Sequence, residues 1–502
     1  MIARRLSWPL GGQPHSFDYA GGVTRTVTPS DHSLVRGLGP VAATCIVIGV
    51  VIGTGVFLKA RVMTCNVGTP GLVITVWVVA GVLSLAGALT YGELCALMPR
   101  AGGEYVFLRE AYGRLWGFLF GWMRFFIGST GGSAALATGF AIFVNVLTGG
   151  ALERHGISLD VGGTASWRFT GVHAAAVSAV AAVTLINCAA VSLGGRIVSV
   201  LTSLKVVLVV GVGTAALMWG RGDWGHFAQS GALGSCEGVS HAARGGISGF
   251  GAAMMAALWA YNGWNEMTYV AGEVKDPRRN LPRALIGGLA GVGFLYVFIN
   301  TAYFYVLSPV EIASVGLSSS VATQVMARVV GPAALTLMAA ALAGSIFTAL
   351  LSTSLVCARI PYAMANDGLF FRGLAPLSRR TSVPVRALFA QAAWTTVLVL
   401  SGSFDTLTDY AIFAILLFWG MAAGSVFIVR RRTPHVPGQY RTVGYPVVPA
   451  LFLLVTAWLL VNAVITAPRQ SLGGLGLIAL GLPFYWYWSR QSTQAPHGHI
   501  VT

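Results

Sequence analysis

The chain has 502 residues, of which 55% are hydrophobic and only 10% are charged. An ordinary soluble domain carries about 25% charged residues, so the composition excludes a soluble globular protein and predicts an integral membrane protein. The net charge is +16, but the basic residues lie between apolar runs. Membrane topology therefore explains this excess better than nucleic-acid binding does.

Apolar runs long enough to cross a bilayer as helices, about 20 residues each, recur along the chain. Twelve are predicted, at approximately 37–60, 70–98, 115–147, 170–193, 196–219, 246–272, 283–308, 330–358, 386–403, 407–429, 446–467 and 471–489. Residues 1–35 have little apolar content and are expected to form a disordered cytoplasmic tail. Residues 491–502 are expected to form a second cytoplasmic tail.

The distribution of Lys and Arg predicts the orientation of the spans. With twelve spans, most of these residues fall on the side that holds both ends of the chain. Cytoplasmic loops are enriched in Lys and Arg. We therefore expect a multi-pass protein of the plasma membrane with both termini in the cytoplasm.

Two spans are interrupted by residues that favour a break in a helix. Gly53, Thr54 and Gly55 lie within the first span, and Asn262 and Gly263 lie within the sixth. Each broken span opens a group of five, which predicts an inverted repeat with a substrate site near the membrane midplane. The expected units are residues 36–219 and 220–430, followed by two appended spans in 431–490.

Several motifs resemble the amino acid–polyamine–organocation transporters, and in particular their L-type and cationic amino acid branches. They are residues 53–57 (GTGVF), 70–72 (PGL), 91–94 (YGEL), 102–107 (GGEYVF), 259–283 and 359–368. The resemblance extends over approximately residues 36–490. It implies an all-α fold of five plus five inverted helices with two more appended. It also implies transport of free L-amino acids by alternating access, often as exchange.

A broken helix at mid-membrane offers both partners that an amino acid zwitterion needs. The N–H groups of Gly53, Thr54 and Gly55 open the second half of the first span, where the helix dipole favours a carboxylate. A branched side chain at Gly55 is expected to take the space of that carboxylate. Carbonyls near Val51, Ile52, Trp259 and Asn262 are expected to accept hydrogen bonds from the ammonium group.

The resemblance implies roles for residues around the sixth-span break, which includes Gly263. Trp259 matches an aromatic gate over the substrate, although an interfacial or packing role is the alternative. Asn262 either hydrogen-bonds the substrate or narrows the pocket. Asn265 matches a polar residue that binds or orients substrate, with a structural hydrogen bond as the alternative.

Charged residues near this break have several possible partners. Glu266 is a candidate proton carrier, a partner for a basic side chain or a solvated carboxylate. Arg124, in the third span, is expected to face the same vestibule or to pair with Glu266. The resemblance suggests an inner-gate ion pair for Glu273. Glu93 and Glu104 are expected to pair with nearby arginines.

Lys205 is the one lysine predicted in the interior of a span, because Lys59 falls at the end of the first. It lies nine residues after Arg196, which places it about 13 Å into the hydrocarbon core. A charge at that depth is a candidate functional group. The resemblance suggests that its ammonium replaces a sodium ion and holds carbonyls of the first span near Gly53. We therefore expect sodium-independent transport.

Other classes of function and partner are disfavoured. None of the three lysines is followed by Ser or Thr, so no phosphate-binding loop of an ATP-driven pump is present. No catalytic set, metal constellation, cofactor or nucleic-acid partner is indicated. The six cysteines form no C-x-x-C pair, and most lie within or beside apolar runs, which suits buried free thiols; no disulfide is predicted. The resemblance implies that a cysteine between spans three and four tethers the heavy chain of the family's eukaryotic light chains; residues 148–171 contain no Cys, so no disulfide-linked heavy chain is expected.

The leading hypothesis is an exchanger of small or medium neutral L-amino acids, because the stretches expected to line the pocket offer no acidic partner for a cationic side chain except Glu266. A proton-coupled symporter, a cationic amino acid or polyamine permease and a membrane sensor remain as alternatives.

Overall fold

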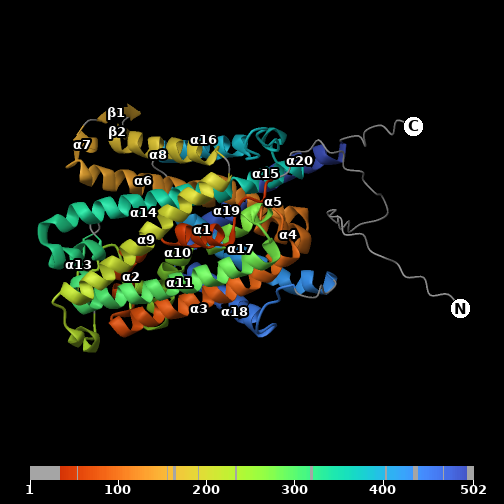
Figure 1. The fold of residues 1–502 in the computed structure, drawn as a ribbon. Helices are drawn as coiled ribbons and strands as arrows, with labels where there is room; N and C mark the ends of the chain where they lie inside the picture. The colour runs from red at the N-terminus through yellow and green to blue at the C-terminus, as the bar shows by residue number, and fades with distance from the viewer. Residues whose placement is uncertain are drawn as a thin grey trace, which may run out of the picture.

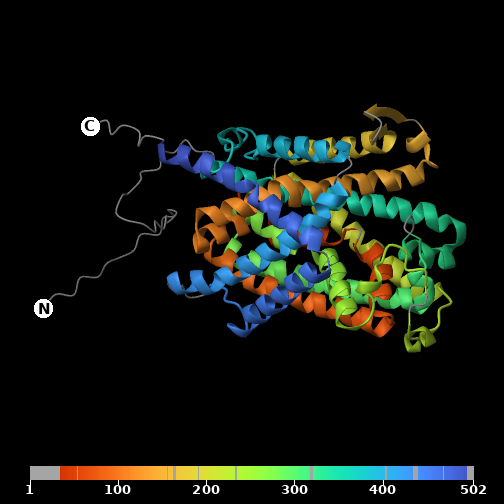
Figure 2. The ribbon, with the colours of Figure 1, turned by 180° about the vertical axis from the view of Figure 1, so that it is seen from behind.

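The computed structural model describes residues 34–494 except 54, 155, 162–164, 190, 232–233, 317–319, 402–403, 434–438 and 467. The two expected tails and Thr54 therefore lie wholly or mostly outside the described residues. The molecule is a bundle of long helices that run side by side (Figure 1). The last helices of the chain cover the side of the bundle that is seen from behind (Figure 2).

The first half of the chain contains the first five spans and their connections. Its elements are α1 (Pro40–Val51), α2 (Gly55–Val67), α3 (Pro70–Leu97), α4 (Glu104–Tyr112), α5 (Arg114–Met123), the π-helix η1 (Arg124–Gly128), α6 (Ser129–Leu147), α7 (Ala151–Arg154), β1 (Gly156–Val161), β2 (Ala165–Thr170), α8 (Gly171–Asn187) and α9 (Val191–Trp219). Span one is the bent pair α1 and α2, and span three is the continuous run α5, η1 and α6.

The second half begins after α9. Its elements are the 3-10 helices η2 (Trp224–Ala228) and η3 (His241–Ala243), α10 (Gly246–Tyr261), the 3-10 helix η4 (Trp264–Glu273), α11 (Pro277–Val306), α12 (Pro309–Ala313), α13 (Val321–Val330), η5 (Gly331–Ala333), α14 (Ala334–Cys357), α15 (Arg359–Asn366), η6 (Arg372–Leu374), α16 (Val385–Ser401), α17 (Phe404–Arg432), α18 (Val447–Thr466), α19 (Pro468–Ala479) and α20 (Gly481–Gln494). Among the described residues, seven runs of helix are long and apolar enough to cross a membrane, and the bent pair makes eight. The shorter α8 and α16, the broken α10–η4 and the α19–α20 pair complete the twelve-helix fold.

A small β-hairpin departs from the all-α expectation. Strands β1 and β2 pair antiparallel from Gly156 opposite Thr170 to Val161 opposite Ala165. The hairpin connects α7 to α8 at one end of the bundle (Figure 1). It lies between spans three and four and leaves the helical bundle unchanged.

Equivalent helices of the two halves pack against each other. The second span of the first half, α3, packs along α11, which is the second span of the second half. The third spans, α6 and α14, form a second extensive pairing between the halves, and α1 and α2 also pack against α11 and α10. Consequently the broken spans α1–α2 and α10–η4 are enclosed by helices from both halves.

Both predicted breaks are present. α1 ends at Val51 and α2 begins at Gly55, with a bend of 43° between them. α10 ends at Tyr261, and Gly263 follows with a φ of +101°. A Cβ at Gly263 would lie 2.3 Å from the Val50 side chain, so this close, left-handed position requires glycine.

One prediction about the cysteines is wrong. Cys65, near the end of α2, forms a disulfide with Cys236, which lies 171 residues away in the loop before α10. The remaining four, Cys45, Cys95, Cys188 and Cys357, are free thiols. Spacing along the chain carries no signal for the pair, because only the packing of the loop onto α2 brings the two residues together.

Candidate functional site

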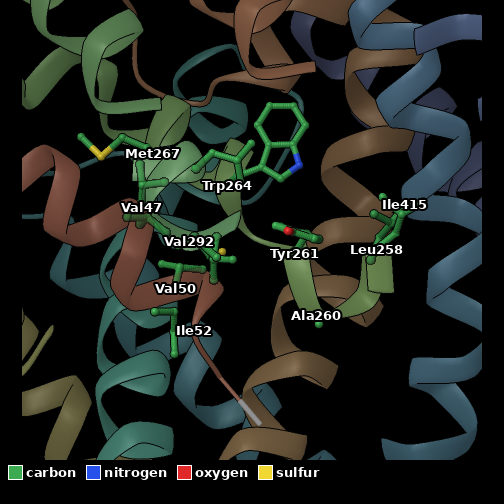
Figure 3. Packing of buried hydrophobic residues seen from close by; sticks show 14 of the residues in the cluster. Val47, Val50, Ile52, Leu258, Ala260, Tyr261, Trp264, Met267, Val292 and Ile415 are labelled. Atoms are coloured by element: carbon green, nitrogen blue, oxygen red, sulfur yellow. The ribbon is translucent and has the colours of Figure 1, made fainter. Parts of the chain in front are cut away.

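The two helix breaks lie against each other in the centre of the bundle. Figure 3 shows Val50 and Ile52 of the first span in the same apolar cluster as Tyr261 and Trp264 of the sixth. A Cβ at Gly55 would lie 2.5 Å from the Cβ of Ala260. The expectation that Gly55 leaves room for a carboxylate is therefore corrected: its missing side chain lets α2 approach α10.

Gly53 has a different environment. Apart from its two neighbours in the chain, no described residue places an atom within 4 Å of the position that its Cβ would take. Its N–H donates to the Val51 carbonyl at 2.8 Å, across the bend that precedes α2. Gly53 therefore borders free space at the start of the second half-helix, where the dipole favours an anion.

Tyr296 of α11 connects the two breaks and is not among the residues predicted from the sequence. Its hydroxyl lies 2.8 Å from the Ala260 carbonyl and 3.0 Å from the Val51 carbonyl, so one proton is shared between the ends of α10 and α1. The ring meets Trp77 edge-on at 4.9 Å. A tyrosine within an apolar span needs a partner for its hydroxyl, but that signal does not reveal which carbonyls provide it.

Lys205 of α9 holds the end of α1 from the other side. Its side chain is buried, and its Nζ donates to the Gly49 carbonyl at 3.0 Å and to the Ile52 carbonyl at 2.5 Å. A Cβ at Gly49 would lie 2.5 Å from the Thr202 hydroxyl and 3.1 Å from the Ser352 hydroxyl. The ammonium thus lies beside the break where α1, α9 and α14 converge. Its role in transport stays a prediction.

Trp259 and Asn262 border a small space beside the sixth-span break. They line a cavity of about 20 Å³ together with Met255, Leu258, Ile415, Leu416 and Trp419. This volume holds about one water molecule. The Asn262 Oδ1 is buried and has no hydrogen-bond partner among the described residues, so it is available to a ligand.

Glu104, the first residue of α4, lies at the centre of a buried polar cluster. Its carboxylate accepts hydrogen bonds at 2.7 Å from the Tyr91 hydroxyl, the Tyr269 hydroxyl and the Asn265 Nδ2. The predicted arginine partner is therefore wrong for Glu104, because neutral donors from α3 and η4 surround it. The prediction is confirmed for Glu93, whose Oε1 lies 3.2 Å from the Arg430 Nε.

Arg124 and Glu266 form a buried ion pair. The Arg124 Nη2 donates to the Glu266 Oε1 at 2.5 Å, and the guanidinium lies 5.5 Å from the centre of the Tyr269 ring. Arg124 begins the π-helix η1 within span three, and such local π-turns are frequent at functional sites. The Glu266 Oε2 has no hydrogen-bond partner among the described residues.

Glu273 and Arg359 form a second buried pair, this time in bidentate geometry. The Nε and Nη2 of Arg359 donate to the two carboxylate oxygens of Glu273 at 2.6 and 2.8 Å. We refer to all these links as the η4 clamp: Asn265, Glu266, Tyr269 and Glu273 on η4, held by Glu104, Arg124 and Arg359 from α4, η1 and α15. The clamp fixes the second half of the broken sixth span.

The amino acid permease family model matches residues 38–482, which include both breaks and the clamp. The chain belongs to the amino acid permease family. This permease is 31% identical to the serine/threonine exchanger SteT of Bacillus subtilis over 91% of its own length and 97% of the exchanger. It is 26% identical to the mouse b(0,+)-type amino acid transporter 1 over 90% and 88% of the two chains.

A further relative is the rabbit large neutral amino acids transporter small subunit 2. The permease is 27% identical to it over 91% of its own length and 82% of that protein. The family and these relatives identify the permease as a multi-pass membrane transporter of amino acids rather than an enzyme.

Proposed function

We propose that this permease exchanges small or medium neutral L-amino acids across the plasma membrane by sodium-independent alternating access. The observation that carries the proposal is the pair of adjacent helix breaks, with Lys205 and Tyr296 hydrogen-bonded to the carbonyls at their ends. The substrate carboxylate binds near the N–H groups that follow Gly53. The Asn262 Oδ1, which has no hydrogen-bond partner among the described residues, accepts from its ammonium group.

The lining of the space beside Trp259 supports a neutral side chain. The residues that border it are apolar or aromatic except for Asn262. A cationic side chain there would lack a carboxylate partner, which makes its transfer from water costly. The name of the serine/threonine exchanger supports small neutral substrates and the exchange mode, and the name of the large neutral amino acids transporter supports a neutral side chain.

The orientation that we propose puts α4, α15 and both termini in the cytoplasm. The Lys and Arg distribution supports it. The Cys65–Cys236 disulfide supports it independently, because disulfides persist in oxidising compartments and this one lies near the end of α2. Residues 148–171 contain no cysteine for a covalent heavy chain, so the proposal includes no heavy chain that is disulfide-linked at that position.

A proton-coupled symporter is the second candidate. Glu104 favours it, since this carboxylate is fully buried and its hydrogen-bond donors among the described residues, Tyr91, Tyr269 and Asn265, are all neutral. Glu266, with one oxygen unpartnered among the described residues, is the other candidate proton carrier. Glu104 would bind a proton when its hydrogen-bond donors on η4 move away, and Glu266 would do so when Arg124 of η1 moves away.

Uptake into proteoliposomes separates these candidates. We expect labelled serine or threonine to enter vesicles preloaded with unlabelled serine, with little entry into empty vesicles and no change when sodium is replaced by choline. Liposomes without protein provide the control. Uptake into empty vesicles that is driven by an inward proton gradient would contradict exchange and support proton-coupled symport. No uptake under any condition would favour a sensor and refute the proposed transport.

A further inference from the structure

A large cavity opens at the α4–α15 end of the bundle, outside the η4 clamp. Its volume is about 490 Å³, and its walls include Arg36, Arg100, Tyr105, Arg109, Gly272 and Asp367. Small-molecule sites have volumes of about 300–1,000 Å³. The cavity is therefore large enough for a free amino acid with some of its hydration water.

The charges in this cavity favour an anionic group. Asp367 is the one acidic residue in the described lining, and it is already paired: it accepts from the Tyr105 hydroxyl at 2.6 Å and from the Arg109 guanidinium. Arg100 and Arg36 are exposed, and the Arg100 Nη1 lies 4.0 Å from the Glu110 carboxylate. An exposed pair at that distance is weak. Two guanidinium groups thus remain available for a carboxylate, whose geometry they match.

The position of the cavity connects it to the transport route. Two segments of its wall lead to the Glu273–Arg359 ion pair. Gly272 lies in the wall and directly precedes Glu273, and the wall residues of α15 follow Arg359 in the same helix. Arg36 precedes span one, and the Leu38 N–H donates to the Glu273 carbonyl at 3.0 Å. The walls therefore come from α4 with the residues before it and from the ends of spans one, six and eight, rather than from the outer faces of α9 and α18 where lipid would lie.

We propose that this cavity binds the α-carboxylate of an amino acid at the cytoplasmic mouth, before the η4 clamp opens. The inference rests on the proposed transport function and adds a second substrate site on one side of the membrane. Arg36 and Arg100 attract the carboxylate, and the cationic mouth raises the local substrate concentration. The site lowers the apparent KM on the cytoplasmic side alone.

The test uses the full-length permease in proteoliposomes whose orientation is established by tag accessibility. Exchange is measured while the substrate concentration is varied on one side at a time. In Arg36→Gln/Arg100→Gln, the cytoplasmic KM should rise about three- to tenfold, as expected for the loss of two exposed charge contacts. The KM on the opposite side should not change. Higher ionic strength should raise the cytoplasmic KM of the wild type more than that of the variant.

The matched control is Arg379→Gln/Arg380→Gln, which removes two exposed arginines from the loop between α15 and α16. This control should retain the wild-type KM on both sides. An unchanged cytoplasmic KM in the cavity variant, or an equal rise in the control, would overturn the inference. An effect that vanishes when anionic lipid is left out of the vesicles would also overturn it, because the ligand would then be a lipid headgroup. Wild-type protein that shows no exchange would instead refute the proposed function itself.

Discussion

An ammonium group buried within a transmembrane helix needs strong compensation. Placing a lysine at the centre of a span costs at least about 2.5 kcal/mol. Lys205 is compensated by the Gly49 and Ile52 carbonyls at the end of α1. The Ile52 carbonyl is available because α1 stops at Val51. The lysine and the break therefore stabilise each other. Without the break the ammonium would lack the Ile52 carbonyl as an acceptor, and without the lysine these carbonyls would lose a donor.

Removing this ammonium should impair transport more than folding. We expect the Lys205→Ala protein to reach the membrane and to remain folded when it is purified in detergent. Its transport rate or substrate affinity should fall at least about tenfold, because two charge-assisted hydrogen bonds of about 1.5–3 kcal/mol each are lost. Lys275→Ala, at an exposed loop lysine, is the control. Normal kinetics in Lys205→Ala, or a sodium requirement in the wild type, would contradict the assigned role.

Gly53 and Gly55 should respond differently to a side chain. Gly53→Val projects into free space at the proposed carboxylate site, so it should abolish transport with little change in melting temperature. Gly55→Ala places a Cβ 2.5 Å from Ala260, and overpacking of this kind costs about 1–3 kcal/mol. It should therefore lower the melting temperature.

The control for these two glycines is Gly287→Val, since a Cβ at this exposed position of α11 meets no atom within 4 Å among the described residues. It should leave both transport and melting temperature unchanged. If Gly53→Val transports its substrate with normal affinity, the substrate carboxylate does not bind at this site.

At the scale of elements, the clamp explains how a 3-10 segment is held in the bundle. Residues of η4 have fewer favourable backbone hydrogen bonds than an α-helix, and side chains supply the missing contacts. Asn265, Glu266 and Glu273 reach three different elements, α4, η1 and α15. α4 precedes span three, η1 lies within it, and α15 forms the end of span eight. The second half of span six can therefore move relative to spans three and eight only if these links break.

The Glu273–Arg359 pair allows stability and gating to be separated. Removing one partner leaves a buried, uncompensated charge, so Glu273→Leu and Arg359→Met should each lose about 3–5 kcal/mol of stability. The double variant should recover most of this loss. It should still transport poorly if the pair acts as a gate. Normal transport by a stable double variant would show that the pair is structural only.

At the scale of the whole molecule, the disulfide joins parts that are distant along the chain. Cys65 belongs to α2, whereas Cys236 lies in the loop that leads to α10. The Asn66 side chain also donates to the Ala243 carbonyl at 2.6 Å, and the Gly245 N–H donates to the Asn66 carbonyl at 2.7 Å. The loop thus connects the first half of span six to the end of the second half of span one.

Breaking the disulfide should loosen this connection. Cys65→Ser/Cys236→Ser, or reduction of the wild type, should lower the melting temperature in detergent, in line with the loss of about 2–4 kcal/mol that is typical of such bonds. Cys188→Ser removes a free thiol and should have no such effect. A melting temperature that is insensitive to reductant in the wild type would show that the bond contributes nothing to stability.

The sequence alone predicted the properties that depend on local composition. Apolar runs predicted the twelve spans, because a bilayer demands continuous hydrophobic helices. Glycines within the first and sixth runs predicted the breaks, since their backbone tolerates conformations that a helix excludes. An intramembrane charge marked Lys205 as a candidate functional residue. Each of these signals is carried by a residue and its close neighbours in the chain.

Only the tertiary structure decided which distant groups meet. The hydroxyl of Tyr296 lies between two carbonyls that belong to different spans, Glu104 is surrounded by Tyr91, Tyr269 and Asn265 instead of an arginine, and Cys65 bonds to Cys236. Gly55 likewise faces Ala260 rather than free space. Such pairings depend on the rotation and relative depth of helices packed side by side, and neither quantity is encoded in the spacing of residues along one helix.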